Sequence, residues 1–208
     1  MAGLHHYHFD FTSDHATPSG AGRAVVSGHD VQLYESEEFL ISTVGDYLAD
    51  GLRLGQPLLV IATASHRRAL RDRMRLLGVD PDELVEGRDA VWLDAAMVID
   101  AFMEGGRPNA ELFAATVGSV LQRLTAQRPY VVVRAYGEMV DLLWRTGKAE
   151  HALALEEMWN ALARSYRFAL LCTYARSTLE RDADTELLRR MEEQHARVLP
   201  FEPGPQAS

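Results

Sequence analysis

The apolar run PLLVIA, residues 57–62, contains no polar side chain over six positions. A parallel strand that is covered on both faces has this pattern, whereas a strand with one face in water alternates apolar and polar residues. Apolar residues recur at helical spacing on both sides of the run, over 39–52 before it and up to Leu77 after it. A buried strand between two helices predicts a parallel sheet with helices on its faces.

The same alternation continues along the chain. Further strands are predicted at residues 31–34, 90–93, 130–133 and 168–172. Ser65, Asp94 and Asn109 are suited to begin the helices that follow, since their side chains can accept backbone hydrogen bonds. A last helix is expected to carry Leu187 through Val198, with His195 on its apolar stripe as a satisfied core histidine and Pro200 ending it. The fold class is therefore α/β, with a mostly parallel sheet of about five strands and helices on both faces.

Composition supports one folded domain. The chain has 208 residues, 47% of them hydrophobic and 25% charged, which is ordinary globular usage. Residues 29–202 are predicted to form the domain, with a flexible arm over 1–28 and a disordered tail over 203–208. The arm contains His5, His6, His8 and His15, which we expect to be solvated rather than to bind a metal, because nothing nearby fixes a ligand geometry.

Net charge, apolar content and cysteine count exclude several classes of partner, location and site. The formal net charge of -9 disfavours direct binding to nucleic acid. No apolar run approaches the about 20 residues needed to cross a bilayer, and no signal peptide is apparent, so a cytoplasmic location is expected. Cys172 is the only cysteine, which rules out an intrachain disulfide and a Cys-rich zinc site.

Polar and aromatic side chains follow the predicted strands. In an open parallel sheet, ligands bind beyond the carboxyl ends of the strands. The residues expected to line a ligand pocket there are Tyr34, Glu35, His66, Arg134, Tyr136, Glu138, Cys172 and Tyr174. Each also has a structural alternative: Arg134 can form a buried ion pair with Glu138 or Glu35, and Tyr34 can be a core residue.

The sequence gives weaker support to an enzymatic function. Cys172, His66 and Glu138 have the residue types of a nucleophile, a base and an orienting acid, yet no nucleophile motif surrounds Cys172. A phosphate-binding loop is absent after the first strand, where the carboxylates of Glu35, Glu37 and Glu38 would repel a triphosphate. We therefore expect no catalytic residue, no cofactor and no metal site.

Several short motifs occur in a fixed order: HDVQLYE (29–35), the turn from Gly51 to Gly55, YGEM (136–139), LLW (142–144), LEEMWN (155–160) and CTY (172–174). Together they resemble the MEDS family, the methanogen/methylotroph, DcmR sensory domain, over about residues 29–180. HARVLP (195–200) resembles a segment that often closes such domains.

The resemblance implies a KaiC/RecA-like three-layer core that has lost its phosphate loop. It also implies a sensory role, proposed for the family to concern hydrocarbon derivatives or other small molecules, with output through a fused domain or a signalling partner. The leading hypothesis is thus a non-enzymatic, ligand-responsive module. The alternatives are a ligand-free interaction module, acting by homodimer formation or by docking to a kinase or anti-sigma partner, and a hydrolase centred on Cys172.

Overall fold

The computed structural model describes residues 28–128, 130–182 and 184–200. A six-stranded sheet runs through this part of the chain in the order β3-β2-β6-β7-β1-β8, and all of its strand pairs are parallel. Its strands are β1 (Gly28–Tyr34), β2 (Leu58–Ala62), β3 (Ala90–Asp94), β6 (Val133–Gly137), β7 (Phe168–Ala175) and β8 (Arg197–Leu199). The predicted arm, apart from Gly28, and the predicted tail lie outside the described residues.

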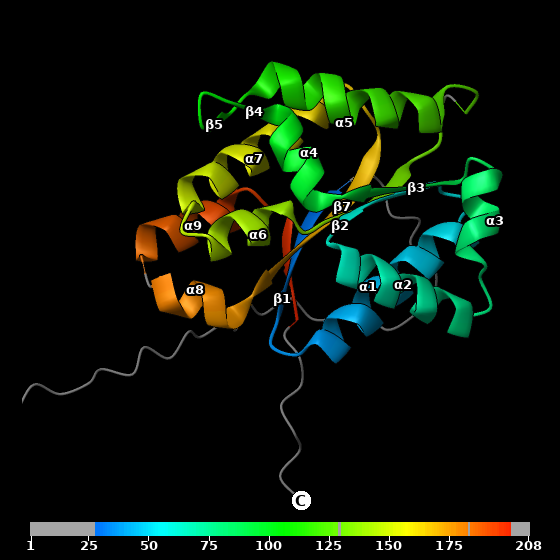
Figure 1. The fold of residues 1–208 in the computed structure, drawn as a ribbon, viewed down its shortest axis with the longest axis horizontal. Helices are drawn as coiled ribbons and strands as arrows, with labels where there is room; N and C mark the ends of the chain where they lie inside the picture. The colour runs from blue at the N-terminus through cyan, green and yellow to red at the C-terminus, as the bar shows by residue number, and fades with distance from the viewer. Residues whose placement is uncertain (1–27, 129, 183, 201–208) are drawn as a thin grey trace, which may run out of the picture.

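Helices cover both faces of the sheet, which gives three layers (Figure 1). One face carries α1 (Glu37–Arg53) and α2 (Ala64–Leu76), and the other carries α4 (Ala95–Phe102), α5 (Ala110–Thr125), α6 (Met139–Arg145) and α7 (Ala149–Leu162). The shorter elements are α3 (Pro81–Glu86), α8 (Arg176–Asp182), α9 (Thr185–Glu193) and the hairpin of β4 (Met103–Glu104) and β5 (Arg107–Pro108). The predicted α/β class and the helices on both faces are confirmed, with six strands instead of about five.

The run that predicts the sheet lies near its centre. β2 is paired with β3 on one side and β6 on the other, and all five of its residues are fully buried. Core residues divide between the two faces because successive strand residues point to opposite sides. Leu59 and Ile61 pack with α4 to α7, whereas Leu58 and Val60 pack with α1 and α2.

The structure corrects three predicted elements. The fourth strand begins at Val133 and not at Tyr130, whose side chain is 82% exposed, so Arg134 and Tyr136 lie within β6 and not after it. Thr63, not Ser65, caps α2, while Gly78 follows that helix with a φ of 79° as a C-terminal glycine should. The predicted last helix ends early: α9 stops at Glu193 and β8 follows, so that His195 lies in the loop before β8 and Val198 lies in that strand.

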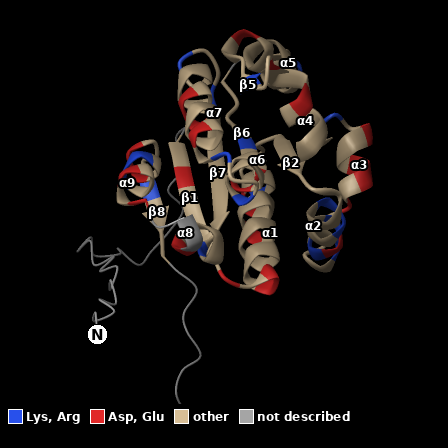
Figure 2. Cartoon of the chain, turned by 60° about the vertical axis from the view of Figure 1, so that its left-hand side comes forward, with Lys and Arg blue, Asp and Glu red and all other residues tan. Residues whose placement is uncertain are grey.

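Arginines gather on α2 and are paired with neighbouring acidic residues (Figure 2). Four of these pairs join α2 to other elements: Arg73 to Asp46 (2.8 Å), Arg71 to Asp82 (2.6 Å), Arg75 to Asp82 (3.0 Å) and Arg67 to Asp94 (2.7 Å). No helix among the described residues is both long and apolar enough to span a bilayer.

Candidate functional site

The carboxyl end of β2 turns directly into α2. Thr63 follows the strand, and its hydroxyl accepts a hydrogen bond from the His66 backbone N–H, which fixes the first turn of the helix. This turn places the His66 ring next to Glu138, the residue that follows β6. The sequence thus brings the two neighbouring strand ends into contact through one buried acidic side chain.

His66 bridges two carboxylates. Its Nδ1 lies 2.5 Å from Glu138 Oε2 and its Nε2 lies 2.5 Å from Glu37 Oε2, while Glu138 Oε1 also accepts the Thr63 backbone N–H. The hydrogen bond to Glu138 raises the pKa of His66 more than burial lowers it. Burial alone would raise the pKa of Glu138, but the hydrogen bonds from His66 and Thr63 and the charge of His66 lower it. Both shifts favour the charged forms, so the contact is an ion pair wherever His66 is protonated and Glu138 is not.

Of two buried tyrosines at this edge, Tyr136 extends this network and Tyr34 belongs to a separate one. The Tyr136 hydroxyl donates to Glu138 Oε2 (3.2 Å) and lies 3.3 Å from Thr173 Oγ1 on β7. The Tyr34 hydroxyl donates to Asp141 Oδ2 (3.0 Å) on α6, which also receives the Arg145 guanidinium. Burial raises the pKa of both hydroxyls, so both stay protonated. We call the set of Glu37, His66, Tyr136, Glu138 and Thr173 the edge cluster.

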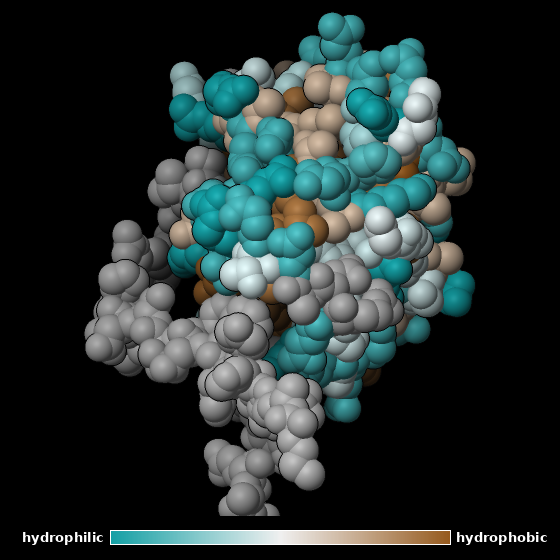
Figure 3. Space-filling view, turned by 90° about the vertical axis from the view of Figure 1, so that its left-hand side faces the viewer, coloured by the Kyte–Doolittle hydropathy of each residue, from teal (hydrophilic) through white to brown (hydrophobic). Residues whose placement is uncertain are grey.

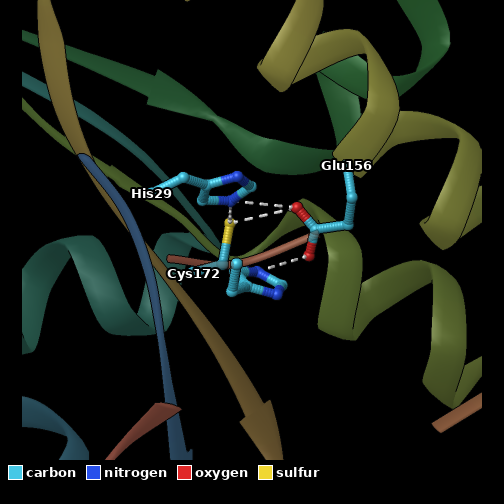
Figure 4. Close-up of side chains that lie close together, drawn as sticks. His29, Glu156 and Cys172 are labelled. Atoms are coloured by element: carbon cyan, nitrogen blue, oxygen red, sulfur yellow. Dashed lines mark hydrogen bonds and ion pairs between the residues drawn. The ribbon is translucent and has the colours of Figure 1, made fainter. Parts of the chain in front are cut away.

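A second polar cluster lies on the other face of the sheet (Figure 4). His29 Nε2 is 3.3 Å from Cys172 Sγ and 3.2 Å from Glu156 Oε2, and Cys172 Sγ is 3.5 Å from the same oxygen. His195 Nε2 is 3.3 Å from Glu156 Oε1, which accepts the Tyr174 hydroxyl at 2.8 Å. We call His29, Glu156, Cys172 and His195 the four-donor cluster.

Strand alternation keeps the two clusters apart. Cys172 and Tyr174 point toward α7, whereas Thr173 between them points to the edge cluster. The predicted nucleophile, base and acid are thus not brought together, because Cys172 faces Glu156 while His66 and Glu138 lie on the opposite side. Burial also raises the pKa of the Cys172 thiol well above its usual value, which disfavours a thiolate nucleophile.

The predicted pocket residues consequently fall into separate groups. Tyr34, His66, Tyr136 and Glu138 lie at the carboxyl edge of the sheet, as expected. Glu35 is 53% exposed and pairs with Arg176 at 2.8 Å. Cys172 and Tyr174 belong to the other face.

Arg134 departs furthest from expectation. It lies opposite Leu58, the first residue of β2, and so near the amino end of the sheet. Its guanidinium sits 4.5 Å from the centre of the Tyr47 ring, and its Nε has no hydrogen-bond partner in the described structure. The predicted ion pair with Glu138 or Glu35 is wrong, because both carboxylates bind other residues.

A shallow groove of about 550 Å³ opens beside the carboxyl end of β3. It lies between the carboxyl end of β3, α4 and α5, and its walls include Trp92, Met97 and Val120. The ion pair of Arg67 and Asp94 borders it, and Arg67 follows His66 directly on α2. The groove therefore combines apolar walls with one charged end.

From the sequence alone, His29, Glu156 and Asp141 are not candidate site residues, and His195 is interpreted as a satisfied core histidine. A signal was present, since His29, Glu156, Cys172 and His195 lie in four of the quoted motifs: HDVQLYE, LEEMWN, CTY and HARVLP. Their spacing of 16 to 127 residues shows no local metal-site pattern, so only the fold reveals the contact.

Comparison with known proteins agrees with the motifs. The family model described as the methanogen/methylotroph, DcmR sensory domain matches residues 28–190. A search of curated proteins gives no significant match. Among solved structures, the chain is similar to a KaiC-like protein from the hyperthermophilic archaeon Pyrococcus horikoshii, with 16% identity and a TM-score of 0.47. That match covers 73% of this chain and 65% of the other protein.

Proposed function

The chain belongs to the methanogen/methylotroph, DcmR sensory domain family, and we propose that it acts as a non-enzymatic module that binds a small molecule beside the carboxyl edge of its sheet. The family establishes a sensory or regulatory role. The ligand class and its route to an output partner are the proposal.

The groove beside β3 is the observation that carries this proposal. Its volume of about 550 Å³ falls within the range of small-molecule sites, about 300–1,000 Å³. Trp92, Met97 and Val98 offer apolar contact, while Arg67 and Arg123 supply positive charge at its border. These features suit a short hydrocarbon derivative with one polar or anionic end.

The edge cluster provides a way to transmit binding. Arg67 and His66 are consecutive on the first turns of α2, and the Thr63 N–H at the start of that helix donates to Glu138. A ligand that draws Arg67 away from Asp94 would shift this turn and with it the contacts to Glu138. Such a ligand must bind one arrangement of the turn more tightly than the other to change its population.

The rival interaction module predicts an exposed apolar patch on the last helix. In the described chain, none of the exposed large hydrophobic residues lies in α9, which instead carries ion pairs from Arg189 to Glu186 (2.6 Å) and from Arg190 to Glu150 (2.9 Å). The side of the molecule where α8 and α9 lie is mostly hydrophilic, with small apolar spots (Figure 3). This surface lacks the apolar patch that would favour the rival, whereas the other feature expected of the rival, the lack of an enclosed pocket, is met because the described groove is shallow and open.

Native mass spectrometry of the purified chain, followed by mild denaturation, tests for a bound molecule. Thermal melting with a panel of short-chain alcohols, carboxylic acids and halogenated hydrocarbons then identifies the ligand class. Ser119→Leu fills the groove from the exposed side of α5 and should abolish the response, whereas Gln122→Leu on the same helix, away from the groove, should not. A response that survives Ser119→Leu, or none to any compound class, contradicts the proposal.

A further inference from the structure

We propose that the four-donor cluster binds one divalent transition-metal ion, with Zn²⁺ preferred, through His29, Cys172, His195 and one carboxylate oxygen of Glu156. The four ligand atoms all lie within 4.8 Å of one another. They come from β1, α7, β7 and the loop before β8, so an ion would join four segments that are distant in sequence. This inference is independent of the groove.

The spacing of the donors fits tetrahedral coordination. Zinc–nitrogen bonds of about 2.0–2.1 Å and zinc–sulfur bonds of about 2.3 Å place neighbouring ligands about 3.3–3.8 Å apart. The contacts between His29, Cys172 and Glu156 Oε2 measure 3.2, 3.3 and 3.5 Å, whereas His195 is 3.3 Å from the other oxygen, Oε1, and the four donors lie within 4.8 Å of one another, so His195 would have to move closer to the ion. Small side-chain adjustments would therefore admit the ion.

Outer hydrogen bonds already orient both histidines. His29 Nδ1 lies 3.0 Å from Asn160 Oδ1, whose amide nitrogen donates to Gln194, and His195 Nδ1 lies 2.7 Å from the Met191 carbonyl oxygen. Each Nδ1 must be the donor in these contacts, because its partner is an oxygen acceptor. In the neutral rings, both Nε2 lone pairs consequently point into the cluster, which is the arrangement found around metal-binding histidines.

Without a cation, this arrangement is poorly satisfied. The His195 side chain is fully buried, and its Nε2 has no hydrogen-bond partner while it faces a carboxylate oxygen. Glu156 is also fully buried. A buried carboxylate and an acceptor lone pair at this distance call for a positive species between them.

A divalent ion balances the charges. Binding would displace the Cys172 thiol proton to solvent and form the metal–thiolate bond, so one thiolate and one carboxylate neutralise the two positive charges. The mixed nitrogen, sulfur and oxygen set suits Zn²⁺ and its neighbours better than Mg²⁺ or Ca²⁺, which prefer oxygen ligands. Four protein ligands leave no open position, so the site would be structural or sensory and not catalytic.

Cobalt substitution tests the site with a spectroscopic signature. The 208-residue chain should carry His5, His6, His8 and His15 replaced by Gln, because those arm histidines can also bind metals. After chelation under reducing conditions, titration with Co²⁺ should give one ion per chain and a thiolate-to-cobalt band in the near ultraviolet. Cys172 is the only cysteine, so this band can report only on the proposed site.

Matched variants separate binding from folding. Cys172→Ser should remove the band, and His195→Ala should weaken cobalt affinity at least about a hundredfold, whereas His151→Ala on α7 should leave both unchanged. Zn²⁺ should displace the cobalt. A folded parent chain that gives no thiolate band in excess Co²⁺ would overturn the proposal and show that a proton alone occupies the cluster. An affinity that His195→Ala and Glu156→Gln leave unchanged would also overturn it.

Discussion

Breaking the pair of His66 and Glu138 should remove about 2 kcal/mol of coupling energy at mildly acidic pH. A hydrogen bond to a charged group contributes about 1.5–3 kcal/mol. We expect a coupling energy within that range for this pair, because its side chains are only 12% and 5% exposed. Glu138→Gln keeps the shape and an oxygen that can accept the Thr63 N–H, so it removes mainly the charge.

The coupling should depend on pH with a defined sign. The folded-state pKa of His66 lies above its ordinary value of 6.5, so its contribution is complete below about pH 6.5 and lost as pH rises through the folded pKa. The folded-state pKa of Glu138 lies below its ordinary value of 4.5, so its contribution is present above that pH and lost as pH falls through the folded pKa. The coupling is therefore largest between about pH 4.5 and 6.5.

A double-mutant cycle measures this coupling. Urea unfolding of the parent chain, His66→Gln, Glu138→Gln and the double variant gives the interaction free energy at about pH 5.5 and again at about pH 8.5. Other titrating groups cancel in the cycle. The exposed pair of Arg189 and Glu186 is the matched control and should give no measurable coupling, because solvent screens it. A coupling for His66 and Glu138 at the lower pH that is no larger than this control, or one that grows as pH rises, refutes the reasoning.

Three substitutions test other parts of the structure by denaturant unfolding. Asp141→Ala should lower the free energy of unfolding by about 3 kcal/mol, because this buried carboxylate accepts the Ala175 N–H. A loss near zero would mean that water replaces the carboxylate. Gly51→Ala should be destabilising, since its Cβ would lie 2.7–2.8 Å from the Arg134 side chain. Arg134→Ala should relieve part of that cost in the double variant, because it removes Cγ and Nε but keeps the Cβ at 2.8 Å; fully additive losses would contradict the clash. Asp94→Ala should cost about 1–2 kcal/mol, because it removes the cap of α4, and an unchanged midpoint would argue against that role.

The sequence predicts the fold best where one local cause decides it. The 57–62 run becomes β2 because apolar side chains are needed on both faces of a central strand. The run at 130–133 misleads because apolar character alone does not set strand pairing. β6 begins where Val133 pairs with Phe168 and Arg134 pairs with Leu58, and the buried Arg134 is tolerated beside the Tyr47 ring.

The C-terminal segment shows a second limit. Helical periodicity suggests one long helix, yet residues 197–199 form a strand that pairs only with β1. Arg197 lies opposite Asp30 and donates to its carboxylate at 3.0 Å. Such a short edge strand depends on a partner that is distant in sequence, so local periodicity cannot indicate it.

The expectation that site residues lie at the carboxyl ends of the strands identifies the residues at that edge, but it places Cys172 in the wrong group. Tyr34, His66 and Glu138 meet this expectation because each lies at or just beyond a carboxyl end. Cys172 lies three residues before the end of β7, and alternation along the strand turns its side chain away from Thr173 and the edge cluster. Alternation along β7 was available from the sequence once the strand was placed at 168–175.

The two clusters differ in what they still require. In the edge cluster, both His66 nitrogens and both Glu138 oxygens have partners within the protein, so the cluster is complete and suited to transmit a shift of α2. In the four-donor cluster, the His195 Nε2 lone pair faces a buried carboxylate and has no donor of its own. Buried polar groups without partners are costly, and an acceptor lone pair that faces a carboxylate is best satisfied by a bound cation or a proton between them. We therefore place the proposed metal site on the Cys172 face of β7. The proposed small-molecule site is the groove and not the edge cluster, because the edge cluster is already complete.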